Sequence, residues 1–223
     1  MPGATSNSSL KIRDLILLPA LITLGITLLR LAGELAHWSP LFFNSAAGGG
    51  MAIVGISWLP FLFGPYFAVK LACAEQSASG VWKTFGLSLL GLAIMVAGGF
   101  VGFAPHLKFP GREILGIFLI VLGPTLITLA WPALFKVLVA YAYAARIPVA
   151  VVMFFALRGH WGTHYDALPP TYSGPASFFG KYMVVAFLPQ MLVWIAFTVL
   201  VGALVGSIVA ALVFRGKTTP AAP

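Results

Sequence analysis

The chain has 223 residues, of which 60% are hydrophobic and only 8% are charged, and its mean hydropathy is +1.00. Soluble domains carry roughly 25% charged residues, so the charged side chains here are too few to cover a soluble fold of this length. The net charge of +8 does not indicate nucleic-acid binding, because Lys and Arg lie mainly at the ends of apolar segments, where they would meet lipid phosphates.

Six segments are apolar and long enough to cross a bilayer as helices, which requires about 20 residues each. They comprise residues 15–37, 51–72, 82–104, 114–131, 133–157 and 183–214. The apolar stretch 114–157 is too long for one crossing, and Trp131-Pro132 is the best turn within it. We therefore predict an all-α integral membrane protein, a single bundle of about six transmembrane helices that passes repeatedly through the cell membrane. Residues 1–14 would form a short cytoplasmic tail and residues 215–223 a disordered one.

The distribution of Lys and Arg favours a cytoplasmic location for both termini, because cytoplasmic loops of membrane proteins carry an excess of these residues. In this orientation seven of them lie inside, namely Lys11, Arg13, Lys70, Lys83, Lys136, Arg215 and Lys217. Four lie outside, namely Lys108, Arg112, Arg158 and Lys181.

Polar residues recur every three or four positions along the first span and form a stripe about 80° wide on a helix. The stripe consists of Thr23, Thr27, Arg30, Glu34 and His37. An arginine at mid-membrane costs about 2.5 to 3.5 kcal/mol on insertion scales, so the stripe should face the bundle interior or a wet cavity. Glu34, one turn after Arg30, offsets part of that cost. Two interpretations remain open: a self-paired charge that locks the helix into the bundle, or the lining of a ligand site.

Arg146 lies about halfway along the fifth predicted span and has no acidic partner in that segment. Pro148 removes a backbone donor two residues later, so a kink there could free a carbonyl that satisfies the guanidinium. The alternative is an anionic or carbonyl-bearing ligand, such as a lipid head group, a quinone or a carboxylate.

Proline and glycine spacing predicts how the helices bend and pack. Prolines recur in five of the six spans, so we expect several kinked helices, and the second span, with Pro60 and Pro65, is the best candidate for a bent or discontinuous one. Small residues one turn apart let two backbones approach closely. Two such pairs occur, Gly98 with Gly102 and Gly202 with Gly206. We interpret both pairs as contacts inside the bundle, with self-association or contact with other membrane subunits as the alternative.

The four histidines fall on the outer side of the membrane in this topology. His160, His164 and Asp166 provide three potential ligands within seven residues, a mixture compatible with zinc or another transition metal. The alternative is a hydrogen-bonded aromatic loop at the membrane interface, which the neighbouring glycines Gly159 and Gly162 favour. No other cofactor is implied.

No nucleophile elbow, glycine-rich phosphate loop or His-Glu-x-x-His helix is present in the sequence, so nothing marks the chain as an enzyme. Three hypotheses follow. The first, favoured by the small soluble parts, is a non-catalytic subunit or assembly partner of a membrane complex. The second is a small transporter or ligand-binding protein that uses Arg30, Glu34 and Arg146. The third is a membrane enzyme with an outward-facing metal at His160, His164 and Asp166.

Overall fold

The computed structural model describes residues 11–214 except 77, 105 and 171, and the regular elements in this part of the chain are all helical. The predicted C-terminal tail, with Arg215 and Lys217, and most of the predicted N-terminal tail lie outside the described residues. An all-α fold is therefore confirmed for the described part.

The helices are joined by two long connections, residues 36–58 and 160–177, and by shorter ones elsewhere, and the first long connection contains a 3₁₀ turn, Ala47–Gly49. The first five are α1 (Ile12–Leu35), α2 (Leu59–Cys73), α3 (Val81–Phe103), α4 (Arg112–Thr125) and α5 (Pro132–Gly159). A 3₁₀ turn, Leu126–Leu129, extends α4. The last segment begins with α6 (Phe178–Tyr182), passes through π-helical stretches at Met183–Phe187 and Pro189–Val193, and ends as α7 (Trp194–Val213).

Within the described residues, five segments are long and apolar enough to cross a membrane. They are α1, α3, α4 with its 3₁₀ turn, α5, and the continuous stretch Phe178–Val213. This composition and architecture are compatible with a membrane protein built as a helical bundle.

The second predicted span, 51–72, is helical only in its later part. α2 begins at Leu59 and has 15 residues, about 22 Å of helix, which is shorter than the hydrocarbon core of a bilayer. Pro60 lies in the first turn of α2, where its missing N–H would have no intrahelical partner in any case. The discontinuity expected in this span therefore lies before Pro60, and Pro65 is accommodated inside the helix.

The turn between the fourth and fifth predicted spans is fixed by Trp131. α5 begins at Pro132, directly after this residue. The Trp131 side chain is fully buried, and its indole N–H donates to the carbonyl oxygen of Gln76 at 2.7 Å. α5 therefore begins next to a buried residue, and Arg146 lies near the middle of this helix.

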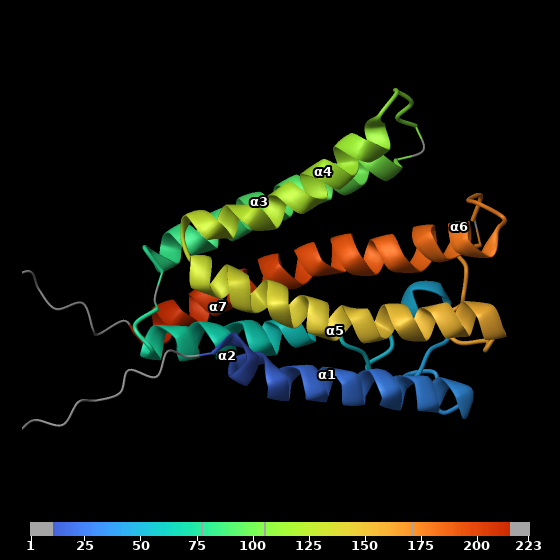
Figure 1. Ribbon diagram of the computed structural model, residues 1–223, viewed down its shortest axis with the longest axis horizontal. Helices are drawn as coiled ribbons and strands as arrows, with labels where there is room; N and C mark the ends of the chain where they lie inside the picture. Colours follow the sequence, from blue (N-terminus) through green and yellow to red (C-terminus); the bar gives the residue numbers. More distant parts are fainter. Residues whose placement is uncertain (1–10, 77, 105, 171, 215–223) are drawn as a thin grey trace, which may run out of the picture.

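Successive helices run in opposite directions, so α1 begins and α7 ends at the same end of the bundle (Figure 1). α5 packs against α1 and α7, α2 packs along α7, and α3 pairs with α4 beside α7. The buried core lies mainly between α2, α5 and α7, where Phe67, Tyr141 and Leu200 are fully enclosed.

Both glycine pairs lie at helix contacts within the chain. A Cβ atom at Gly98 would lie 2.7 Å from the carbonyl oxygen of Gly116 in α4, and one at Gly206 would lie 2.9 Å from the carbonyl oxygen of Gly64 in α2. Gly102 and Gly202 face the same two partners. The two faces predicted to pack closely are thus covered by helices of the same chain.

Candidate functional site

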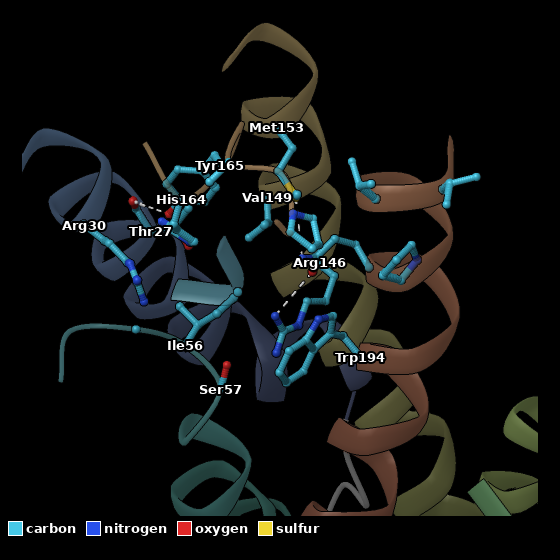
Figure 2. A pocket seen from close by; sticks show the side chains of 18 of the residues that line it. Thr27, Arg30, Ile56, Ser57, Arg146, Val149, Met153, His164, Tyr165 and Trp194 are labelled. Carbon is cyan, nitrogen blue, oxygen red and sulfur yellow. Dashed lines mark hydrogen bonds between the residues drawn. The ribbon is translucent and has the colours of Figure 1, made fainter. Parts of the chain in front are cut away.

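A cavity of about 450 Å³ is bordered by the later half of α1 and by the segment that leads into α7, and so lies away from the start of α1 and the end of α7. Figure 2 shows the side chains that line it. Its polar wall residues come from α1, from the segment before α2, from α5, from the loop after α5, from the π-helical segment and from the first residue of α7. They include Thr27, Arg30, Ser57, Arg146, His164, Tyr165, Gln190 and Trp194. Gly48 of the 3₁₀ turn Ala47–Gly49 and the non-helical residues Gly55, Ile56 and Ser57 form one side, so the connection that precedes α2 is part of the wall.

The π-helical stretches supply the opposite side of the cavity. Val184, Val185, Pro189 and Gln190 all lie on the wall. π-helical turns are rare, and they occur frequently at functional sites because they change which side chains face inward. The π-helical stretches therefore occur in the part of this segment that lines the cavity.

The polar stripe of α1 faces inward. Thr23, Thr27, Arg30 and Glu34 are all buried, at 1%, 2%, 8% and 3% exposure, whereas His37 is exposed just after the helix end. Arg30 Nε donates to Glu34 Oε1 at 2.7 Å, which is the ion pair that the spacing predicts.

Arg30 also holds the chain between α1 and α2. Its Nη2 atom donates to the carbonyl oxygens of Asn44 at 3.1 Å and Gly49 at 2.9 Å. Gly49 adopts a φ of +83°, and a Cβ atom there would lie 2.8 Å from Arg30 Nη2. This position therefore requires glycine both for its backbone conformation and for the space beside the guanidinium.

Glu34 has a second partner that local sequence patterns do not indicate. The backbone N–H of His164 donates to Glu34 Oε2 at 2.7 Å, and His164 Nδ1 lies 2.6 Å from Glu34 Oε1. Burial lowers the pKa of His164, although the hydrogen bond to Glu34 opposes this shift. The imidazole is therefore neutral at pH 7, and its Nδ1–H donates to the carboxylate.

The three residues of the predicted metal site have separate partners. His160 is exposed at the C-terminal cap of α5, and His164 is committed to Glu34. Asp166 accepts from the backbone N–H groups of Gly162 and Thr163, at 2.9 and 2.8 Å, and from the Thr163 hydroxyl at 2.7 Å. In the described part of the chain no group of three or more His, Cys, Asp or Glu side chains is placed to hold a metal ion.

Tyrosines connect α1 to the rest of the cavity wall. The Tyr165 hydroxyl donates to the carbonyl oxygen of Thr27 at 3.2 Å, and burial raises the pKa of Tyr165, so the phenol stays neutral. Deeper in the bundle, the Tyr141 hydroxyl lies 2.9 Å from the Thr23 hydroxyl. The inward stripe of α1 is thus hydrogen-bonded to α5 and to the loop that follows α5.

Arg146 is the most unusual residue of the wall. Its side chain is 4% exposed, its Nη1 donates to Gln190 Oε1 at 3.3 Å, and its guanidinium carbon lies 4.5 Å from the centre of the Trp194 ring (Figure 2). Its Nε atom is buried without a hydrogen-bond partner among the described residues. α5 continues as a helix through Pro148, and among the described residues no backbone carbonyl oxygen accepts a hydrogen bond from the Arg146 guanidinium, so the local acceptor that Pro148 could have freed is not used.

Gln190 and Trp194 line the cavity and contact Arg146, and the sequence analysis did not identify either residue. Gln190 carries the one amide side chain in the apolar segment 183–214, and Trp194 follows it by four residues, about one helical turn. That isolated amide was a usable signal, because a polar side chain inside a membrane helix should face the protein interior.

Comparisons of the chain with protein-family models, with curated proteins and with solved structures give no match. What the protein does is therefore inferred from the cavity wall. Two guanidinium groups from different helices border one cavity, and guanidinium groups bind carboxylates and phosphates through paired, charge-assisted hydrogen bonds.

Proposed function

We propose that this chain is a membrane protein that binds an organic monoanion in the cavity between α1, α5 and the π-helical segment. The observation that carries the proposal is Arg146, a buried cation on the cavity wall with an unpartnered Nε atom and no acidic partner among the described residues. A buried charge without a partner is costly, and an anionic ligand would supply the missing partner.

The charges on the wall favour a single negative charge on the ligand. Arg30 is neutralised by Glu34, and His164 is neutral, so Arg146 leaves the wall with one uncompensated positive charge. Arg30 Nη1 has no hydrogen-bond partner among the described residues, and it remains available as a second donor for the ligand.

The start of α2 adds to the positive potential. Gly55, Ile56 and Ser57 line the cavity, and Ser57 directly precedes Trp58, the N-cap residue of α2, so the N-terminal end of α2 lies near the cavity. Helix N-termini carry a partial positive charge, and broken membrane helices use such ends to bind anionic groups. The Ser57 hydroxyl on the same side is an additional donor.

The rest of the wall favours an apolar body for the ligand. Val149 and Met153 of α5 face the cavity, together with Val184, Val185 and Pro189 of the π-helical segment. A ligand with one charged end and a short apolar chain would place its charge near Arg146 and bury its chain against these side chains. With both termini in the cytoplasm, the cavity would lie in the outer half of the membrane.

An uncompensated buried charge also separates this proposal from the hypothesis of a non-catalytic subunit. A subunit that only fills space would gain stability from an apolar residue at position 146. Ligand binding gives Arg146 a role that explains why its desolvation is tolerated.

Binding of hexanoate to the protein in lipid nanodiscs tests the proposal by isothermal titration calorimetry, with empty nanodiscs as the reference. We expect saturable heat with hexanoate but not with hexylammonium, which has the same chain and the opposite charge. Affinity should rise about fourfold for each methylene from propionate to hexanoate, as expected for burial of apolar surface.

Arg146→Met should weaken hexanoate binding at least about 30-fold, because it removes one partner of a desolvated charge pair. Lys136→Met is the matched control, since Lys136 belongs to α5 but not to the cavity wall, and it should bind like the wild type. Hexanoate heats equal to those of empty nanodiscs, or wild-type affinity in Arg146→Met, would refute the proposal.

A further inference from the structure

A second cavity, of about 410 Å³, lies at the end of α5 and shares no lining residue with the first. Three basic side chains border it: Arg158 from the last turn of α5, His160 from the cap of the same helix, and Lys181 from α6. Leu157 and Phe178 supply an apolar part of the wall.

The two full positive charges of this cavity have no local partner. Neither the Arg158 nor the Lys181 side chain takes part in an ion pair or hydrogen bond within the described part of the chain. Asp166 also borders the cavity, but both of its oxygens accept hydrogen bonds from Gly162 and Thr163. Arg158, Lys181 and Asp166 together leave one net positive charge, which matches a phosphodiester.

The cavity lies at the ends of two candidate membrane spans. The candidate span Pro132–Gly159 ends here, and the candidate span Phe178–Val213 begins here. Ends of membrane helices lie at the level of the lipid head groups, where Lys and Arg meet phosphates and aromatic side chains lie at the boundary with the hydrocarbon. Phe178 packs edge-on against Phe154 of α5 at 5.2 Å between ring centres, so an apolar surface lies beside the basic residues.

We propose that this cavity binds the phosphodiester head group of an anionic membrane lipid between Arg158 and Lys181. The phosphate would accept hydrogen bonds from the guanidinium and the ammonium group, and the glycerol end of the lipid would contact Leu157 and Phe178. The site requires the two spans to lie in a bilayer, but it does not depend on the anion cavity proposed above.

Native mass spectrometry of the delipidated protein in detergent tests this site, with phosphatidylglycerol and phosphatidylcholine added in equal amounts. We expect the wild type to retain phosphatidylglycerol preferentially. Arg158→Gln combined with Lys181→Gln should lower that retention about 30-fold, since each basic residue near anionic lipid contributes about fivefold. Lys70→Gln combined with Lys108→Gln removes the same charge at exposed positions outside the cavity and should leave retention unchanged.

Equal retention in the wild type and the Arg158/Lys181 variant would overturn the proposal. Phosphatidylglycerol retention that persists in excess inorganic phosphate supports a lipid as the ligand. Phosphate binding without preferential lipid retention would identify free phosphate instead and would overturn the lipid assignment.

Hexanoate binding by the same variant checks its fold and separates the two proposals, because Arg158 and Lys181 do not border the first cavity. Loss of lipid with hexanoate binding intact supports the lipid site alone. If the double variant lost both, the single variants Arg158→Gln and Lys181→Gln would be measured, each with an expected loss of about fivefold in lipid retention. Unchanged lipid retention in both single variants would overturn the site.

Discussion

The two arginines on the wall of the first cavity, Arg30 and Arg146, are buried to a similar degree but differ in their partners. Replacing each arginine by methionine tests whether Arg146, which has no acidic partner among the described residues, stabilises the fold. Arg146→Met keeps an apolar stem and removes the charge. Arg30→Met does the same but leaves Glu34 behind, and the side chain of Glu34 is fully buried. We expect the two variants to differ clearly in their free energy of unfolding.

The contacts of each arginine set the expected magnitude. Arg146→Met removes a cation–π contact with Trp194, about 0.5 to 2 kcal/mol, and a long hydrogen bond to Gln190, about 0.5 to 1.5 kcal/mol. It also removes a buried, unpartnered Nε, which costs about 1 to 3 kcal/mol in the wild type. These contributions oppose one another, so the free energy of unfolding should stay within about 2 kcal/mol of the wild-type value.

Arg30→Met should lower the free energy of unfolding by about 3 to 5 kcal/mol, the range for breaking a buried ion pair by removing one partner. The change leaves the Glu34 carboxylate without its guanidinium and the carbonyl oxygens of Asn44 and Gly49 without their donor. The measurement is an SDS titration in mixed micelles followed by circular dichroism, with Lys136→Met as the control. If Arg146→Met were destabilised as much as Arg30→Met, Arg146 would be a structural residue and the argument for a ligand would fail.

Two further predictions use neighbouring glycines as matched pairs. Gly49→Ala should destabilise the protein more than Gly48→Ala, because both have positive φ but only the Cβ at position 49 meets Arg30. The same SDS titration gives the free energy of unfolding of both variants, and the difference between the two values measures the cost of displacing the Arg30 guanidinium. Equal losses of stability in the two variants would contradict this prediction. Gly98→Ala should destabilise the contact between α3 and α4, whereas Gly99→Ala, which meets nothing within 4 Å, should be neutral or stabilising by up to about 1 kcal/mol. Thermal unfolding in detergent checks this pair, and similar melting temperatures for both variants would show that the helices do not approach as closely as described.

The helical segments were largely predictable from the sequence because hydrophobicity and proline position act locally. Residues 132–159 form one helix after the turn at Trp131-Pro132, and the apolar runs around α1, α3 and α4 form helices close to the expected limits. The segment 51–58 was not predictable in the same way. Its residues are apolar enough for a span, yet they form the non-helical wall of a cavity, and composition alone does not separate an apolar helix from an apolar loop buried against protein.

In the candidate site, too, local contacts were predictable from the sequence and long-range contacts were not. The Arg30–Glu34 ion pair was predictable because its partners are one helical turn apart. The contact between Glu34 and His164 joins residues 130 positions apart, and Arg146 meets Gln190 across 44. No periodicity in the sequence encodes such pairs, since they depend on how the helices are arranged in space. Sequence proximity therefore groups His164 with His160 and Asp166, either as a candidate metal site or as an interfacial loop, whereas the partner of His164 in the structure lies on α1.

The departures from regular structure occur together, and this coincidence supports a function for the first cavity more strongly than any one of them. The non-helical segment before α2, the π-helical stretches and the unpartnered guanidinium of Arg146 border the same space. In the other half of the bundle, α2 and α7 meet glycine to glycine, with backbones in close contact. Each departure costs stability, and natural sequences tolerate such costs mainly where a site requires them. If they were accidents of packing, there would be no reason for all three to border one cavity with a net positive charge.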